Sequence, residues 1–174
     1  MEKFRNPVIE AIIKRRSIRR YTGKAVNKSD INILLKSAMY APSARNQQPW
    51  HYLVIDDRSL LQRIMEVHPY ASMLSEANLA ILICGDEELE LSKGYWSVDC
   101  AAATQNLLLA AYSVGLGAVW LGVYPRKERQ EGIRKIFELP SNIHPFSLVS
   151  IGYPAEDKAV PERYKEERIR WNKW

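Results

Sequence analysis

The run Leu79–Cys84 (Leu-Ala-Ile-Leu-Ile-Cys) is apolar at every position, and it constrains the fold more than any other stretch of the chain. A strand of this kind has both faces buried, so it must lie inside a sheet that is covered on its two sides. The run is too short to cross a bilayer as a helix, and the sequence has no longer apolar stretch that suits this role. We therefore expect a central sheet with helices on both faces and no membrane partner.

The patterns elsewhere predict a regular order of helices and strands around that run. A helix begins at Pro7 after an Asn6 cap, and a second helix begins after an Asn27 cap and ends before Pro42. The other elements that we expect are helices 59–67, 96–114 and 126–138, and strands 50–55, 118–123 and 146–152. This order predicts one domain, residues 1–174, with a mixed sheet between layers of helices.

Several classes of site are disfavoured by the residue pattern. No Gly-x-Gly-x-x-Gly follows the first strand, so a dinucleotide-binding Rossmann domain is not expected. Cys84 and Cys100 fall in apolar segments and are typical of buried thiols in a reducing compartment. The three histidines are widely spaced, so we predict no metal site. The charged N-terminal segment is unlike a signal peptide, which makes a cytoplasmic location the default.

Residues 15–21 (Arg-Arg-Ser-Ile-Arg-Arg-Tyr) place four arginines and one serine within seven positions. Such a cluster repels itself unless an anion lies among the side chains. A phosphate suits this place, because arginine forks and a serine hydroxyl can donate together to phosphate oxygens. A solvated basic surface and a nucleic-acid patch are the alternatives, and the net charge of +5 is compatible with both. Since no aromatic stacking platforms are interleaved with the arginines, we expect no nucleic-acid partner.

A polar loop, residues 41–50 (Ala-Pro-Ser-Ala-Arg-Asn-Gln-Gln-Pro-Trp), joins the second expected helix to the first expected strand. Three consecutive amide side chains lie at its centre: Asn46, Gln47 and Gln48. They can cap backbone groups in an ordinary connection, or they can face the polar edge of a heterocyclic ligand. The residues of this loop, taken alone, leave both interpretations open.

These two segments, together with two later ones, resemble the nitroreductase family of FMN-dependent oxidoreductases. The later segments are Asp-Cys-Ala-Ala-Ala-x-Gln-Asn-Leu-Leu-Leu-Ala with Gly-Leu-Gly-Ala-Val-Trp-Leu-Gly, within residues 99–122, and Ile-Gly-Tyr-Pro-Ala-Glu, residues 151–156. The four motifs occur in the family's order and span most of the chain. The resemblance implies an α+β fold with a mixed, mainly antiparallel central sheet, helices on both faces, and FMN at a homodimer interface.

The resemblance also implies which residues hold the phosphate of FMN. Arg15 and Ser17 match positions that bind it, and Arg16 matches an adjoining contact. Arg163 matches a late basic residue that also reaches the phosphate, with Lys158 as the alternative in this chain.

The resemblance implies further contacts to the flavin, some from the same chain and some from the partner subunit. Leu121 and Gly122 match the strand end that passes near flavin N5. The C-terminal tail, residues 153–174, is expected to wrap the partner subunit. The loop positions that the partner subunit is expected to supply are Pro42, Ser43, Ala44 and Asn46.

The resemblance implies an NAD(P)H-dependent oxidoreductase. Hydride passes from NADH or NADPH to flavin N5, and then to a planar electrophilic acceptor such as a nitroaromatic or a quinone, in a two-step cycle. No protein acid is needed for hydride transfer, and Arg19 matches a residue beside the flavin pyrimidine edge, where it would stabilise the reduced ring electrostatically. A non-catalytic protein that stores or senses FMN is the alternative.

The chain departs from the family's pattern in two places. The interval 85–95 is short, so we expect a small lid and an open site. A family asparagine beside the flavin has no match, because residues 69–71 are Pro-Tyr-Ala. His68 and Tyr70 are candidates to gate or protonate an acceptor. Candidates to line the substrate face, or to pack in the core or dimer, are Tyr95 and Trp96.

Overall fold

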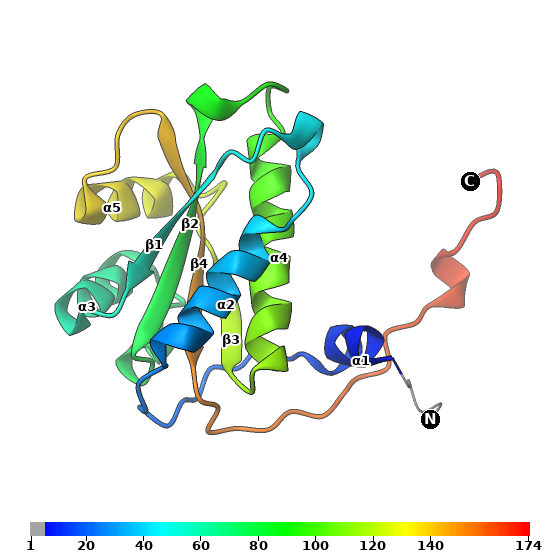
Figure 1. Ribbon diagram of the computed structural model, residues 1–174, viewed down its shortest axis with the longest axis horizontal. Coiled ribbons are helices and arrows are strands. Elements are labelled where there is room, and N and C mark those ends of the chain that lie inside the picture. The colour runs from blue at the N-terminus through cyan, green and yellow to red at the C-terminus, as the bar shows by residue number, and fades with distance from the viewer. Residues whose placement is uncertain (1–5) are drawn as a thin grey trace.

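The computed structural model describes residues 6–174, and a four-stranded sheet lies at its centre (Figure 1). The strands lie in the order β1-β2-β4-β3, and every neighbouring pair is antiparallel. Every residue of β2 is buried, which confirms the central strand that its apolar run predicts. The bounds of the four strands are β1 Trp50–Ile55, β2 Leu79–Asp86, β3 Gly117–Gly122 and β4 Ile143–Gly152.

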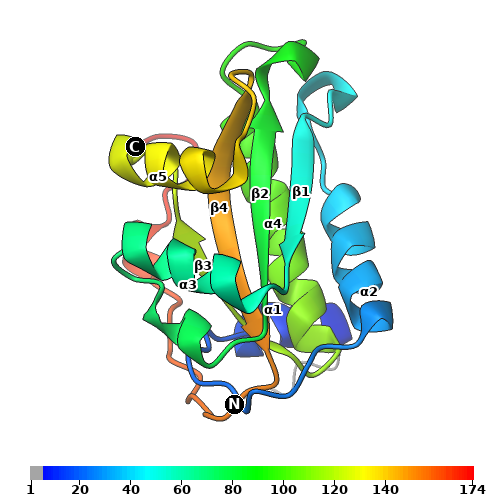
Figure 2. The ribbon, with the colours of Figure 1, turned by 90° about the vertical axis from the view of Figure 1, so that its left-hand side faces the viewer.

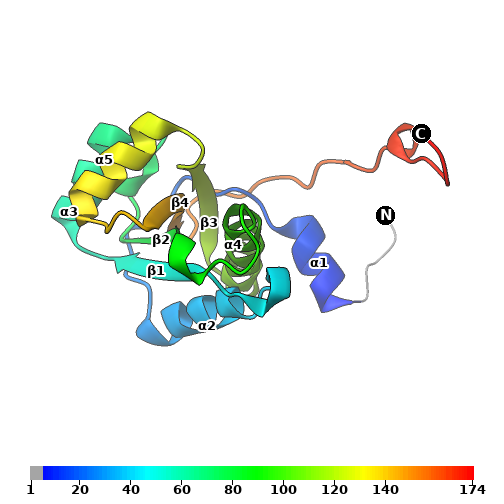
Figure 3. The same cartoon turned by 90° about the horizontal axis from the view of Figure 1, so that it is seen from above.

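Two pairs of helices cover the two faces of the sheet (Figures 2 and 3). Helices α2 (Lys28–Met39) and α4 (Trp96–Ser113) pack on one face, and α3 (Arg58–Val67) and α5 (Lys127–Phe137) pack on the other. Helix α4 lies flat on the sheet because its small and apolar side chains allow burial on more than one side. The α+β class, with helices on both faces of a mainly antiparallel sheet, is therefore confirmed.

The predicted element bounds differ from the observed ones by a few residues at most, but one predicted cap is wrong. Asn27 occupies the N-cap position of α2, yet its side chain makes no capping hydrogen bond to the helix. Its amide nitrogen instead lies 3.3 Å from the hydroxyl of Tyr153. A contact with a distant segment has replaced the local bond that the sequence pattern favoured.

Helix α1 (Pro7–Lys14) and the C-terminal tail lie outside these layers (Figure 1). The predicted Asn6 cap is confirmed, since its Oδ1 accepts from the Val8 amide at 2.9 Å. No residue of α1 is buried, however, and the tail runs away from the body to an exposed Trp171 and Trp174. Among residues 6–174, no helix is long and apolar enough to cross a membrane.

Candidate functional site

The arginine segment, residues 15–21, lies as an extra extended stretch along the outer edge of β3. Ser17 forms a parallel bridge with Ala118 of that strand. Further along the segment, the Arg20 carbonyl accepts from the Ala155 amide at 2.9 Å. The segment is therefore held between β3 and the chain that follows β4.

Two apolar side chains anchor this segment to the core. Ile18 and Tyr21 are buried, and Ile18 packs so closely on Gly117 that a Cβ there would lie 2.7 Å from Ile18 Cγ2. The Tyr21 hydroxyl lies 2.7 Å from the Ile18 carbonyl and 3.2 Å from the Ser150 carbonyl. Burial raises the pKa of Tyr21 to about 12, so the hydroxyl remains a donor at any physiological pH.

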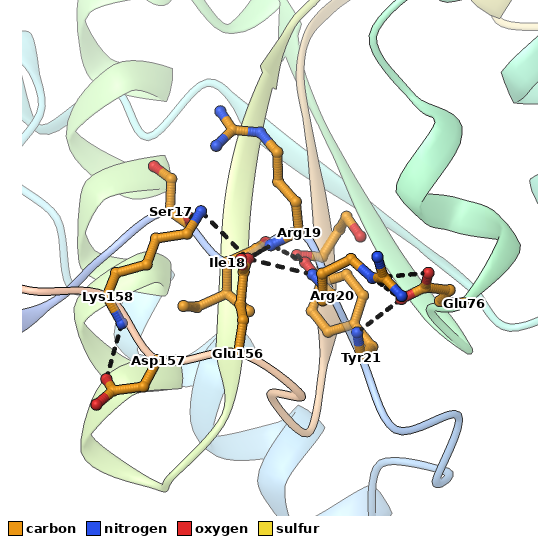
Figure 4. Close-up of polar contacts among 10 residues, drawn as sticks. Ser17, Ile18, Arg19, Arg20, Tyr21, Glu76, Glu156, Asp157 and Lys158 are labelled. Carbon is orange, nitrogen blue, oxygen red and sulfur yellow. Dashed lines mark hydrogen bonds and ion pairs between the residues drawn. The ribbon is translucent and has the colours of Figure 1, made fainter.

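Two carboxylates hold the backbone of the segment (Figure 4). Glu156 accepts from the Arg19 amide at 2.5 Å and from the Arg20 amide at 3.3 Å. Glu76 accepts from the Tyr21 amide at 3.1 Å and pairs with the Arg20 guanidinium at 2.9 Å. Two protein carboxylates therefore lie among the arginines, in addition to the anion that the sequence leads us to expect.

The arginines of the cluster consequently have different partners. Arg20 pairs with Glu76, and Arg16 donates to two carbonyl groups in the last turn of α1. Arg15 is different, because its buried Nε has no hydrogen-bond partner among the described residues. Burial lowers the pKa of Arg15, and the positive charges of Arg16 and Arg163 lower it further. Such an arginine is a natural ligand for an anion, since an unpaired buried donor costs free energy.

A basic pocket of about 390 Å³ opens beside Arg15. It brings together all four positions of the arginine segment that the sequence predicts and adds the predicted Arg163 from the tail. Lys158 also lines it, with Nζ 2.8 Å from the Ser17 carbonyl and 3.2 Å from Glu156. The described residues that line this pocket are Arg15, Arg16, Ser17, Arg19, Lys158, Ala159, Pro161 and Arg163.

The donors of this pocket fit the phosphate end of FMN. The pocket offers guanidinium, ammonium and hydroxyl donors, and an unpartnered buried nitrogen lies at its edge. The Arg19 side chain extends away from Glu156 along β3 (Figure 4). A second pocket of about 470 Å³ shares Arg15, Arg16 and Lys158 with the first and continues toward the end of α4.

The predicted loop positions Pro42, Ser43, Ala44 and Asn46 do not join this pocket within one chain. The Ala44 amide donates at 3.0 Å to Asp99, in the first turn of α4, whereas Leu108 and Tyr112 in the second half of that helix line the larger basic pocket. The 13 positions from Asp99 to Tyr112 correspond to about 20 Å along the helix. Figure 1 shows the loop and the arginine segment at opposite ends of α4.

Side-chain amides of this loop form hydrogen bonds within the loop and to the segments beside it. Gln47 is buried: its Nε2 donates to Asp99 at 2.7 Å, and its Oε1 accepts from the Leu91 amide at 2.8 Å. Gln48 Nε2 donates to Asn46 Oδ1 at 2.7 Å. Capping and bracing therefore explain several of the amide groups, and Asn46 keeps its side-chain nitrogen and one lone pair of Oδ1 for another partner.

The end of β3 contains the two remaining predicted positions. Leu121 is buried in the core beneath α3 and α5, so its side chain faces no pocket. The Gly122 carbonyl accepts two hydrogen bonds, from His68 Nε2 at 3.1 Å and from Arg129 Nη1 at 2.7 Å. No local pattern indicates these contacts, because the three residues come from separate elements.

Trp96 and the two cysteines, which the sequence also singles out, are packed within the protein. Trp96 stacks on His144 with a centroid distance of 5.3 Å and meets Tyr124 edge-on at 4.9 Å, so it is part of an aromatic cluster. Cys84 and Cys100 are buried free thiols, and burial raises the pKa of Cys84 to about 12. Among residues 6–174, no group of His, Cys, Asp and Glu side chains is arranged to hold a metal ion.

Sequence reasoning assigned no role to Glu76 and Glu156. Glu156 ends the motif at residues 151–156, but nothing local indicates that it would reach the arginine segment. Glu76 follows a short 3-10 turn, and only its negative charge could suggest a contact with the arginine segment. A search for carboxylates able to balance the arginines would have had many candidates, because the chain has 20 acidic residues.

Comparison with known proteins finds relatives that match most of the chain. The model of the nitroreductase family matches residues 12–81 and 68–153. A relative in Methanothermobacter thermautotrophicus, named "Putative NADH dehydrogenase/NAD(P)H nitroreductase", is 47% identical over 167 residues, which are 96% of this chain and 87% of the relative.

Two crystal structures extend the comparison to the fold. A protein of the same name from Parabacteroides distasonis is 41% identical, with a TM-score of 0.94 and 97% and 99% of the two chains covered. A "putative nitroreductase in complex with fmn" from Desulfovibrio desulfuricans is 31% identical, with a TM-score of 0.85 and 97% and 98% covered.

Proposed function

Because the chain belongs to the nitroreductase family, we propose that it is an FMN-dependent oxidoreductase that takes hydride from NAD(P)H and delivers it to a planar electrophilic acceptor, such as a nitroaromatic or a quinone. The observation that carries this proposal is the buried, unpartnered Nε of Arg15 beside a pocket that Ser17, Lys158 and Arg163 also line. FMN, when bound, supplies the hydride carrier at N5, and the protein supplies binding, orientation and charge.

The residues of the basic pocket have separate roles in this proposal. Arg15, Ser17 and Arg163 bind the phosphate, and Lys158 adds a fourth donor from the tail. Arg16 contributes its charge, since carbonyl groups of α1 already occupy its guanidinium. Arg19 extends along β3, where its charge would stabilise the negative charge that the ring gains on reduction.

The separation of the two halves along α4 supports a homodimer with two sites. One chain cannot bring Pro42, Ser43, Ala44 and Asn46 to its own basic pocket, so the partner subunit supplies them. Exposed apolar side chains on α1 and α2, among them Val8, Ile12 and Met39, offer surface for the contact. In this proposal, the tail with Trp171 and Trp174 wraps the partner and buries these indoles.

The acceptor site is proposed to be open and tolerant. Only a short interval, with the 3-10 turn Glu87–Leu89, joins β2 to α4, so little protein is available to close over the ring. One exposed face would serve the nicotinamide and the acceptor in turn, which favours a two-step cycle.

Anaerobic reduction of the purified protein tests this proposal. We expect the protein to carry FMN rather than FAD, and NADH or NADPH to bleach the flavin rapidly. A panel of nitroaromatics and quinones should then restore the colour. Bound FMN that neither nicotinamide reduces would overturn the enzyme and favour a storage or sensor role. A protein that takes up no FMN would overturn both interpretations.

A further inference from the structure

We infer that His68 and Arg129 are positioning residues for the cofactor: they clamp the carbonyl of Gly122 and so fix the end of β3 against which the flavin ring lies. This inference rests on the proposed function, because it concerns the same site. It assigns a role to a buried histidine that is neither a metal ligand nor a proton donor.

Two donors from different elements converge on one carbonyl oxygen. His68 directly follows α3 and donates through Nε2 at 3.1 Å, while Arg129 in the first turn of α5 donates through Nη1 at 2.7 Å. The ring of Tyr70 lies over the Arg129 guanidinium, 5.2 Å from its centroid. Two bonds restrain the direction of a carbonyl more tightly than one, since together they occupy both of its lone pairs.

The protonation state of His68 follows from its other nitrogen. The Tyr70 amide donates to Nδ1 at 3.3 Å, so Nδ1 is the acceptor and Nε2 carries the proton that is donated to Gly122. Burial lowers the pKa of His68, and the charge of Arg129 lowers it further, which keeps the ring neutral. Because both nitrogens are engaged, His68 has none with which to protonate an acceptor, so that candidate role is wrong.

The clamped Gly122 carbonyl and the Gly122 N–H both face the outer edge of β3. The Ala118 carbonyl accepts from Ile18, so it points to the outer edge of β3, and the pairing with β4 continues without a shift as far as Gly122. Alternate residues of an antiparallel strand point their amide and carbonyl to the same side, so Gly122 shares this outer edge with Ala118. The clamped carbonyl and the Gly122 N–H therefore lie on the same edge that the Arg19 side chain follows.

The packing of the protein does not explain why residue 122 is a glycine. A Cβ at this position would meet no protein atom within 4 Å, and its φ lies outside the left-handed region. Neither sterics nor backbone conformation within the described chain requires a glycine here. Open space beside a clamped peptide is what the close approach of a flat ligand requires.

The test compares two replacements of His68 in FMN-loaded protein. His68→Gln keeps an N–H donor for Gly122, whereas His68→Phe removes it. We expect His68→Phe to retain FMN through the phosphate pocket, to slow flavin reduction by NADH about tenfold, and to shift the flavin midpoint potential. His68→Gln should restore both quantities to within about twofold of wild type.

Arg129→Met is a second variant that does not alter the buried core, in case His68→Phe fails to fold. It should slow reduction in the same direction, while Lys127→Met on the same helix should change nothing. If FMN is bound and reduced by wild type, but neither His68→Phe nor Arg129→Met alters rate or potential, the clamp is overturned and the proposed function stands. If wild type takes up no FMN, the proposed function itself fails.

Discussion

The carboxylate of Glu156 lies 2.5 Å from the amide nitrogen of Arg19, although 137 positions separate the two residues in the sequence. This contact joins the chain after β4 to the arginine segment, and the same carboxylate pairs with Lys158 at 3.2 Å (Figure 4). Glu156 thus holds the backbone that carries Arg19 and also restrains a cation of the basic pocket.

Replacing Glu156 separates its hydrogen bonds from its charge. Glu156→Gln keeps an acceptor for the amides but loses the charge, whereas Glu156→Ala removes both. We therefore expect the alanine variant to lose about 1–2 kcal/mol of unfolding free energy and to bind FMN more weakly, and the glutamine variant to lose less of both. Urea denaturation and fluorescence titration with FMN measure the two effects. Equal behaviour of the two variants would contradict a role through the acceptor.

The Glu156 carboxylate stabilises the folded protein in its charged form, so this stabilisation depends on pH. The hydrogen bond from Arg19 lowers the pKa of Glu156 below its usual 4.5, so its stabilisation is present above pH 4.5 and is lost as the pH falls through the folded value. Glu156→Gln should flatten this part of the acid dependence in unfolding curves.

Loss of Arg15 should mainly affect FMN binding, whereas loss of Arg19 should mainly affect flavin reduction. Arg15→Ala should weaken FMN binding about 10- to 100-fold with a smaller effect on reduction, because it removes a charged donor to the phosphate. Arg19→Ala should retain FMN but slow its reduction more than it weakens binding. Arg20→Ala is the matched control, since Glu76 already engages that side chain. FMN titration measures binding, and stopped-flow spectroscopy measures the rate of reduction. Equal effects of Arg15→Ala and Arg19→Ala on both quantities would contradict this division.

The proposed exchange of segments between subunits can be tested by mixing inactive variants. In an Arg15→Ala subunit paired with an Asn46→Ala subunit, one site receives both lesions and the other receives neither. Random mixing should therefore restore about one quarter of the wild-type sites, as counted by FMN bound or activity. A site built from one chain alone would show no recovery, because every site would then carry one lesion.

Gly117 links the packing of the core to the site. A Cβ at Gly117 would lie 2.7 Å from Ile18, so Gly117→Ala should displace the arginine segment, cost about 1–3 kcal/mol and weaken FMN binding. Gly132→Ala meets Val67 at the same distance, far from the basic pocket, and should cost similar stability without changing affinity. Thermal unfolding and FMN titration on both variants decide the matter, and equal losses of affinity would refute the link.

Two truncations should separate the roles of the tail. Removal of residues 165–174 takes away Trp171 and Trp174 but keeps Arg163, so we expect a weaker dimer with FMN binding partly kept at high protein concentration. Removal of residues 161–174 also deletes Arg163 and should lower FMN affinity further. Analytical ultracentrifugation and flavin content measure the two losses, and a full-strength dimer after the first truncation would contradict the wrapping of the partner.

The sequence by itself determined the elements and their layers. The bounds of β1 and the central place of β2 follow from local patterns, because the alternation or continuity of apolar side chains reports directly which faces are buried. The convergence of Arg15, Ser17 and Arg163 on one pocket also follows the expectation from the family's motifs.

Only the tertiary structure decided how the charges and donors of the site are shared. It placed Glu76 and Glu156 beside the arginines, left Arg15 Nε without a partner among residues 6–174, separated the loop at Asn46 from the basic pocket and placed His68 against Gly122. The physical reason is the range of the interactions. A helix or strand is specified by neighbours a few positions apart, whereas these contacts join residues tens to more than a hundred positions apart and exist only after the sheet has formed.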